Sequence, residues 1–219
     1  MGAIYDTGRP EELLTGMRLA RQALARGELV VMPTDTVYGL AADAFSPEAV
    51  RALVEAKGRT LASPPPVLVP DLATLDALAE TVPEEVRALV AELWPGALTI
   101  VLDARASLDW DLGETRGTVA LRMPDDPLAL ELLREAGPLA VSSANRTGEP
   151  PATTAAEAQA MLGEHVAIIL DGGPRGTVSS TIIDATALGR PDGRIRVLRE
   201  GAIPTARIRA IVGADRCPE

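Results

Sequence analysis

Short runs of aliphatic residues alternate with amphipathic helical patterns along most of this chain. The runs lie at 29–32 (LVVM), 67–69 (VLV), 97–102 (ALTIVL), 118–122 (TVALR), 138–141 (PLAV), 166–170 (VAIIL), 180–184 (STIID) and 195–198 (IRVL). Their length and aliphatic content are typical of buried strands. Because helical patterns separate many of them, the chain is predicted to fold into an α/β structure in which helices cover a largely buried sheet.

Prolines and glycines mark the ends of the predicted helices. Pro10 begins a pattern that Gly27 ends, and Ser46-Pro47 begins one that Gly58 ends. Proline at the first helical position and glycine after the last one are common boundary signals. Further helices are predicted within 71–93 (two, divided at Pro83), from Asp126-Pro127 to Gly137, from about 154, and after Pro204.

The last third of the chain contains strands with no helix between them. Strands that follow one another directly are joined most simply as antiparallel neighbours, so we expect a mixed, open sheet rather than a purely parallel one. No internal repeat and no long linker divides the 219 residues, and 103–117 and 185–194 are expected to be exposed loops. The sequence therefore predicts a single domain, 1–219.

Composition excludes several classes of protein. The net charge of −10 disfavours loose, sequence-independent binding to nucleic acid, which needs broad phosphate neutralisation. No apolar stretch approaches the ~18 residues of a membrane span, and the N-terminus lacks the pattern of a signal peptide. The single cysteine, Cys217, cannot form an internal disulfide and is expected to be inert. We therefore expect a cytoplasmic protein that makes no membrane contact.

Several common catalytic and binding motifs are missing. The only histidine, His165, lies between a helix and a strand, far in sequence from the serine-rich segments, and is expected to be exposed and structural. No set of Cys and His residues suits a metal, and neither G-x-x-x-x-G-K-[ST] nor G-x-G-x-x-G occurs. A serine hydrolase, a metal site and the usual nucleotide-binding loops are not predicted.

Polar clusters instead follow the predicted strands and helices. They are 33–39 (PTDTVYG), 57–59 (KGR) with Ser63, 118–122 ending at Arg122, 142–148 (SSANRTG), and 171–181 with Arg199. The second cluster holds the only lysine among 21 basic residues, Lys57. Arginine, lysine and many hydroxyls at strand ends suit a phosphate polyanion, because they offer charge-assisted and neutral hydrogen bonds. A helix end followed by capped turns would also account for each cluster alone.

In their order, these clusters resemble the YrdC family of threonylcarbamoyl-AMP synthases. The matching segments are PTDTVYGLAADA, KGR, WPGALTIVL, VALRMPDDPLALELL, SSANRTGEP, DGG with STIID, and VLREGAI. They span roughly 15–205, which leaves 206–219 as a short tail. The resemblance implies a twisted, open, single-domain α/β fold with a large, concave, positively charged cavity.

The resemblance also implies a reaction. L-threonine, bicarbonate or CO2 and ATP would give threonylcarbamoyl-AMP and pyrophosphate, with Mg²⁺ carried by the ATP. The product would feed a separate transferase complex that modifies tRNA beside the anticodon, and contact with tRNA itself is left open. Threonine's amine would capture CO2, and the carbamate oxygen would attack the α-phosphorus. Positioning and charge stabilisation can carry such a reaction without an enzyme nucleophile.

Site residues follow from the same motifs. Those implied for ATP are Lys57, Arg59, Ser63, Thr118, Ser143, Asn145 and Arg199, with Lys57 and Arg59 also implied as catalytic. Those implied for threonine are Thr36, Tyr38, Arg122, Val141 and Ser180. Arg122 is the natural partner of the threonine carboxylate. Thr34 and Asp35 are interpreted as residues that hold the turn.

The chain departs from the family pattern at three places. Leu68 stands where the family often has a histidine that contacts threonine, Ser179 stands where an acidic residue is common, and a serine is replaced near Pro151.

Two other functions fit the sequence less well. An RNA-binding protein could use the same cavity, but aromatic residues make up only 2% of the chain. A sugar-phosphate enzyme would need clustered acidic residues, whereas these motifs are basic and hydroxylic.

Overall fold

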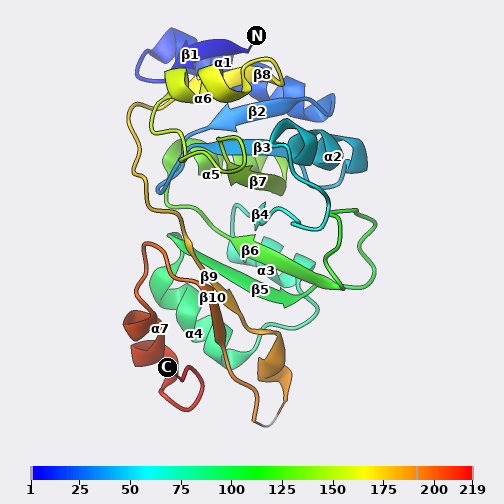
Figure 1. Cartoon of the computed structure of the whole chain (residues 1–219), viewed down its shortest axis with the longest axis vertical. Coiled ribbons are helices and arrows are strands. Elements are labelled where there is room, and N and C mark those ends of the chain that lie inside the picture. Colours follow the sequence, from blue (N-terminus) through cyan, green and yellow to red (C-terminus); the bar gives the residue numbers. More distant parts are fainter. Residues whose placement is uncertain (1, 191, 219) are drawn as a thin grey trace.

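The computed structural model describes residues 2–190 and 192–218, which form one ten-stranded sheet flanked by helices (Figure 1). The strands are β1 (Ala3–Asp6), β2 (Leu29–Met32), β3 (Gly39–Asp43), β4 (Val67–Leu68), β5 (Leu98–Asp103), β6 (Thr118–Arg122), β7 (Leu139–Ser143), β8 (Val166–Asp171), β9 (Thr181–Asp184) and β10 (Arg196–Arg199). The helices are α1 (Pro10–Ala25), α2 (Pro47–Ala56), α3 (Leu72–Leu78), α4 (Glu84–Leu93), α5 (Pro127–Ala136), α6 (Ala155–Leu162) and α7 (Thr205–Val212).

The sheet is mixed and open, as predicted. Its strand order is β1-β8-β2-β3-β7-β4-β6-β5-β9-β10, so β1 and β10 form the edges. Neighbours pair in parallel in β1–β8, β2–β8, β4–β6 and β5–β9, and antiparallel in β2–β3, β3–β7, β4–β7, β5–β6 and β9–β10. The short strand β4 joins the two halves of the sheet, because it pairs with β7 on one side and with β6 on the other.

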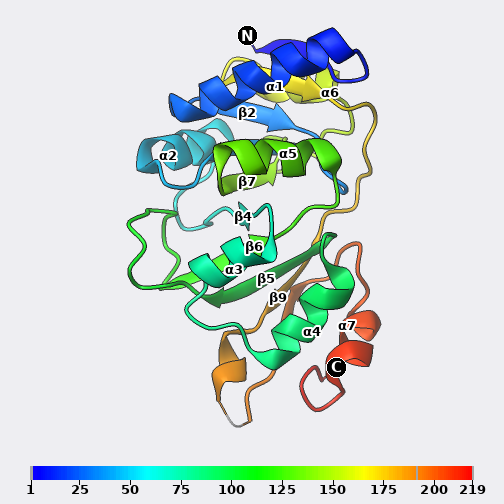
Figure 2. The same ribbon diagram turned by 180° about the vertical axis from the view of Figure 1, so that it is seen from behind.

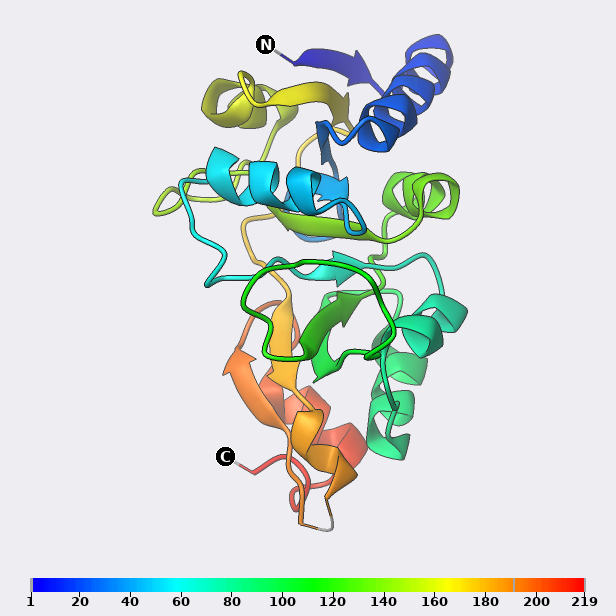
Figure 3. The same cartoon turned by 90° about the vertical axis from the view of Figure 1, so that its right-hand side faces the viewer.

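The two halves are covered differently. Around β8, β2, β3 and β7, helices α1 and α5 lie on one face and α2 and α6 on the other (Figures 2 and 3). Strand β2 therefore buries both faces: Val31 packs with the α2 and α6 side, and Val30 with the α1 and α5 side. In the other half, α3, α4 and α7 lie on one face (Figure 3). Burial of both faces of β2 explains why its sequence, LVVM, contains no polar residue.

The predicted helix boundaries are confirmed by their caps. The Ser46 hydroxyl accepts a hydrogen bond from Ala49 N at 3.3 Å, and Asp126 Oδ1 accepts one from Ala129 N at 2.9 Å. Such caps satisfy N–H groups that the first helical turn leaves unpaired. Gly58 follows α2 with a φ of +65°, a left-handed conformation that favours glycine.

Some segments differ from the sequence-based expectation. Strand β3 is not predicted, because its sequence GLAAD has no β-branched residue and follows the polar segment 33–39. It forms a strand because it pairs with β2 on one side and with β7 on the other. β1 was also missed. The expected loop 185–194 contains a 3₁₀ helix at Thr186–Gly189, and the expected loop 103–117 buries Leu112.

The C-terminal segment is packed against the body of the protein. Helix α7 buries Ile208, and Cys217 has no exposed surface. Burial raises the pKa of the Cys217 thiol, which disfavours the reactive thiolate. His165 is exposed, as expected. None of the helices formed by 2–190 and 192–218 is long and apolar enough to cross a membrane.

Candidate functional site

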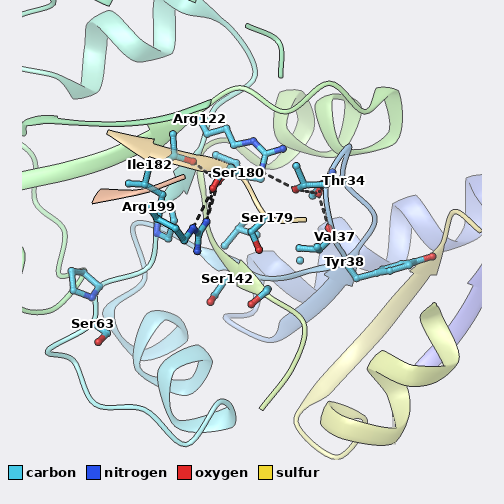
Figure 4. Close-up of a pocket in the computed structure, with 18 of the residues that line it drawn as sticks. Thr34, Val37, Tyr38, Ser63, Arg122, Ser142, Ser179, Ser180, Ile182 and Arg199 are labelled. Carbon is cyan, nitrogen blue, oxygen red and sulfur yellow. Dashed lines mark hydrogen bonds between the residues drawn. The ribbon is translucent and has the colours of Figure 1, made fainter. Parts of the chain in front are cut away.

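A cavity of about 220 Å³ opens between the two halves of the sheet (Figure 4). Nine of the sequence-predicted site residues line it: Thr36, Tyr38, Arg59, Ser63, Arg122, Val141, Ser143, Ser180 and Arg199. Three do not: Lys57, Thr118 and Asn145. The structure therefore brings together residues from four of the polar clusters and from the end of β6.

The turn after β2 is held by Thr34. Its hydroxyl donates to Val37 O at 2.6 Å and accepts from Thr36 N at 3.2 Å. These bonds replace the main-chain pairing that ends with the strand, and they place Thr36 beside the cavity. The prediction that Thr34 holds the turn is confirmed. At Gly39 a Cβ atom would lie 2.7 Å from Val141 Cγ1, so the turn can approach β7 only with glycine there.

Tyr38 lines the cavity, but its side chain is buried in the hydrophobic core. The side chain extends away from the other labelled residues (Figure 4), and the hydroxyl donates to Gly173 O at 2.8 Å. Asp171 Oδ1 lies 3.2 Å from the same oxygen. Burial, and then the Asp171 carboxylate, raise the pKa of Tyr38 to about 12. Tyr38 thus ties the turn to 171–173 through its hydroxyl. The threonine contact that the resemblance implies for Tyr38 stays a prediction.

Arg122 is buried at one end of the cavity. Nε donates to Gly96 O at 2.9 Å, Nη1 donates to Thr36 Oγ1 at 3.1 Å, and Nη2 forms an ion pair with Asp35 at 2.5 Å. Asp35 therefore does more than hold the turn. Burial lowers the pKa of Arg122, and Asp35 opposes that shift. A guanidinium has five N–H donors, and these contacts use three of them. Among the described residues no partner takes the other two, which leaves them for a ligand.

Arg199 lies on the edge strand β10, at the other side of the cavity from the 34–39 turn (Figure 4). Its Nη2 donates to Ser180 O at 2.8 Å, and Nε donates to the same oxygen at 3.2 Å. The Ser180 hydroxyl in turn lies 2.9 Å from Thr99 Oγ1. Burial, followed by the charge of Arg59, lowers the pKa of Arg199. Strands β5 and β10 and the residue before β9 thus meet at this hydroxyl-rich wall.

Lys57 does not line the cavity, but its side chain bonds to the main chain of Ser143, which does. Lys57 is 1% exposed, and Nζ donates to Ser143 O, to Asn145 O at 2.7 Å and, more weakly, to Asn145 Oδ1 at 3.4 Å. An ammonium group has three N–H donors, and these oxygens use all of them. Burial, and then Arg59, lower the pKa of Lys57 to about 8. The Asn145 amide nitrogen is likewise used, since it donates to Arg146 O and Glu149 O.

Thr118 lies at the far end of its strand from Arg122. Its hydroxyl donates to Thr115 O at 2.8 Å and does not line the cavity. The two positions are four steps apart along the strand, or about 13 Å at ~3.3 Å per residue. Only the end of β6 that carries Arg122 lines this cavity. The ATP contact that the resemblance implies for Thr118 stays a prediction.

Sequence reasoning missed several lining residues. They are Thr34, Val37, Gly39, Pro64, Pro66, Leu68, Thr99, Ser142, Ser179 and Ile182. Thr99 carried a usable signal, because it is the one hydroxyl in the aliphatic run 97–102 and its side chain is buried. Leu68, which replaces the family histidine, gives the cavity an apolar wall next to Arg122, its partner in the β4–β6 register.

The donor set suits a phosphate ligand better than a metal held by protein carboxylates. Arg59 and Arg199 line the cavity together with the Ser63, Ser143 and Ser180 hydroxyls. Within 2–190 and 192–218 no group of three or more His, Cys, Asp or Glu residues could hold a metal ion. A divalent cation that arrived with a nucleotide would therefore rely on the phosphates and water for most of its ligands.

The chain is an α/β protein with a basic, hydroxyl-rich cavity between the two halves of its sheet. Comparison with known sequences gives its family. Residues 22–201 match the Sua5_yciO_yrdC family, described as "Telomere recombination". The chain belongs to this family, which confirms the resemblance found in the motifs.

Named relatives are similar over nearly the whole chain. A Mycobacterium tuberculosis protein named "Putative threonylcarbamoyl-AMP synthase" is 48% identical over 216 residues, covering 98% of this chain and 97% of that protein. The threonylcarbamoyl-AMP synthase of Bacillus subtilis is 40% identical, covering 89% of this chain and 56% of that longer protein. The similarity to the first relative thus extends along almost the full length of both chains.

Solved structures share the fold. Sua5 of P. abyssi complexed with L-threonine is 33% identical, with a TM-score of 0.85, and covers 97% of this chain and 61% of that one. E. coli YciO is 24% identical, with a TM-score of 0.81, and the match covers 94% of this chain and 98% of that one. At this identity the match supports the fold alone.

Proposed function

We propose that this protein is a threonylcarbamoyl-AMP synthase, which forms threonylcarbamoyl-AMP and pyrophosphate from L-threonine, bicarbonate or CO2 and ATP. The observation that carries the proposal is one cavity lined by three arginines: a buried Arg122 with two N–H donors to spare, Arg59 and Arg199. Relatives with this name, 48% and 40% identical, and the threonine complex of Sua5 support it. The RNA-binding alternative is not favoured by these relatives.

Threonine would bind at the Arg122 end. The guanidinium would receive the threonine carboxylate, because a planar fork of N–H donors matches a carboxylate in geometry and charge. Thr36 and Ser180 would offer hydroxyls to the substrate, and Val141 and Leu68 would supply apolar surface. Leu68 takes the place of the family histidine here, so contact through van der Waals packing replaces a polar contact.

ATP would bind at the Arg59 and Arg199 end, with Mg²⁺ on its phosphates. The two guanidinium groups and the Ser63 and Ser143 hydroxyls would contact the phosphates. Lys57 would act through its charge, because its own donors are used by main-chain and amide oxygens. Thr118 and the amide group of Asn145 have no direct contact in this proposal.

The reaction needs positioning rather than an enzyme nucleophile. The deprotonated threonine amine adds to the carbon of CO2 and loses a proton, which gives a carbamate anion. A carbamate oxygen then attacks the α-phosphorus of ATP, and the bond to the β-phosphate oxygen breaks so that pyrophosphate leaves with its Mg²⁺. Arg59 and Arg199 would stabilise the negative charge that accumulates on the phosphates. A cavity between two sheet halves would also limit hydrolysis of the carbamate and the adenylate.

We further propose that the product passes to a threonylcarbamoyl transferase that modifies tRNA next to the anticodon, in the cytoplasm. The single cysteine and the acidic charge of the whole chain are compatible with that compartment.

The decisive experiment measures pyrophosphate release from ATP with threonine and bicarbonate supplied together or separately, and identifies the product by mass. Release should require both, and the adenylate should carry the threonylcarbamoyl mass. Pyrophosphate release that ignores threonine would overturn the proposal, and RNA binding without any adenylate would favour the alternative.

A further inference from the structure

Thr147 lies in the loop after β7 and lines no part of the cavity, yet it contacts a residue that does. Its hydroxyl accepts a hydrogen bond from Arg59 Nε at 3.0 Å and donates one to Lys57 O at 2.8 Å. A hydroxyl has one donor and two acceptor lone pairs, so both bonds can form at once. Thr147 therefore connects the main chain at Lys57 to the side chain of Arg59.

The loop that carries Thr147 is fixed without this side chain. Lys57 Nζ reaches into the loop and donates to Ser143 O and Asn145 O. The Thr147 main-chain N–H donates to Lys57 O at 3.1 Å, in the opposite direction. The Asn145 amide is bonded to main-chain oxygens of the same loop. Removing the Thr147 hydroxyl should therefore leave the two segments docked and change mainly Arg59.

Arg59 has few other restraints. It follows the left-handed Gly58 at the end of α2, and its side chain is exposed. A long, exposed side chain samples many rotamers, and a ligand that needs one of them must pay for the ordering. Thr147 binds Nε only, so both terminal nitrogens of Arg59 point their donors elsewhere, with no other hydrogen bond found among the described residues.

We propose that Thr147 is a positioning residue, whose hydroxyl orders the Arg59 guanidinium for the phosphates of ATP without touching the nucleotide. This inference rests on the proposed function to the extent that Arg59 must bind nucleotide phosphates. It adds a residue that no family motif assigned to ATP or threonine.

The test measures binding of α,β-methylene-ATP by calorimetry, with threonine absent. Thr147→Val keeps the shape and the main-chain bond but loses the hydroxyl, and should weaken binding about threefold to tenfold, the range of a typical net hydrogen bond. Thr147→Ser keeps the hydroxyl and should bind within about twofold of wild type. The matched control is Thr81→Val, at an exposed threonine outside the cavity, which should also stay within about twofold.

A double-mutant cycle separates positioning from a general structural effect. In an Arg59→Ala background, Thr147→Val should cost less than about twofold, because its effect passes through the guanidinium. An equal loss in both backgrounds, or a Thr147→Ser variant as weak as Thr147→Val, overturns the proposal. Thermal unfolding checks that each variant is folded, and Thr147→Ala replaces the valine variant in the cycle if that one is not.

The readout also distinguishes this inference from the proposed reaction. Analogue binding needs no turnover, so a wild-type protein that binds the analogue through Arg59 and Thr147 but makes no adenylate would refute the function and keep the positioning role. A wild-type protein that does not bind the analogue at all would refute the positioning role.

Discussion

The two ends of the cavity hold their arginines in opposite ways. At one end, Arg122 is 6% exposed and forms an ion pair with Asp35. At the other end, the contacts of Arg59 and Arg199 are to hydroxyl and main-chain oxygens, and neither forms an ion pair with a described acidic residue. The protein thus balances one positive charge internally and leaves the other two for a ligand.

This difference suggests a division of labour between the ends. Arg122, already compensated by Asp35, suits a single carboxylate that needs orientation more than charge. The other end holds Arg59 and Arg199. Burial lowers the pKa of Lys57 and of Arg199, and the nearby charge of Arg59 lowers both further. Cations that repel one another are relieved by a bound polyanion, as expected for the phosphates of ATP.

The largest effect that tests this division should come from Arg122→Lys. The variant keeps a positive charge but loses the planar fork, so kcat/KM for threonine should fall at least about 100-fold, or ~2.7 kcal/mol. Affinity for α,β-methylene-ATP, measured by calorimetry, should change by less than about threefold. A fall in affinity for α,β-methylene-ATP as large as the fall in kcat/KM for threonine would show that the two ends of the cavity do not bind different substrates.

Arg59→Ala should have the next largest effect. Loss of a guanidinium at the phosphate end should lower turnover at least about tenfold, or ~1.4 kcal/mol of transition-state stabilisation, with KM for threonine unchanged within about twofold. Lys57→Ala should lower turnover to a similar extent. Pyrophosphate release is the measurement, and Arg51→Ala, at an exposed arginine on α2, serves as control. Wild-type turnover in Arg59→Ala would show that 57–59 is only a helix end.

Asp35→Asn tests the internal balance at the Arg122 end. The amide keeps an acceptor oxygen but removes the charge, so the free energy of unfolding should fall by about 1 kcal/mol. Urea unfolding measures this change. Asp76→Asn is the matched control, because Asp76 pairs with Arg87 on the surface with about half of each side chain exposed, and it should cost at most about 0.5 kcal/mol. Equal losses at both sites would contradict a special role for the buried pair.

The smallest effect concerns the pH dependence of stability at the phosphate end. Because the folded pKa of Lys57 is about 8, below its value of 10.5 in the unfolded chain, the folded state binds fewer protons between these values. The contribution of Lys57 to stability therefore rises with pH between about 8 and 10.5, and it is lowest below pH 8, where both states are protonated. From pH 7 to 8.5 the wild type should gain up to about 1 kcal/mol relative to Lys57→Met in urea unfolding. A parallel gain in the variant would assign the slope to other groups.

Much of the fold could be predicted because its signals are local. Pro10, Pro47 and Asp126 begin helices through the geometry of their own turns, and the aliphatic runs mark the central strands. β3 could not be predicted in this way, because Gly39–Asp43 has little intrinsic preference for a strand and becomes one through β2 and β7.

The sequence predicted which segments form the candidate site, but not which of their side chains face the cavity. Polar clusters at the ends of strands and helices pointed to the right segments, yet the direction of each side chain depended on neighbours distant in sequence. Lys57 turns toward oxygens 86 and 88 residues away, and Tyr38 toward the 171–173 segment. No local pattern carries that information.

The sequence by itself determined the α/β class, the mixed sheet, most helix ends and the family, since these follow from periodicity, capping and ordered motifs. Only the tertiary structure decided which polar residues face the cavity. Asp35 and Arg122 lie 87 residues apart and meet because the pairing of β4 with β6 and β7 brings the two halves of the sheet together. Thr118 lies on the same strand as Arg122 but at its other end, about 13 Å away at ~3.3 Å per residue, and so does not line this cavity.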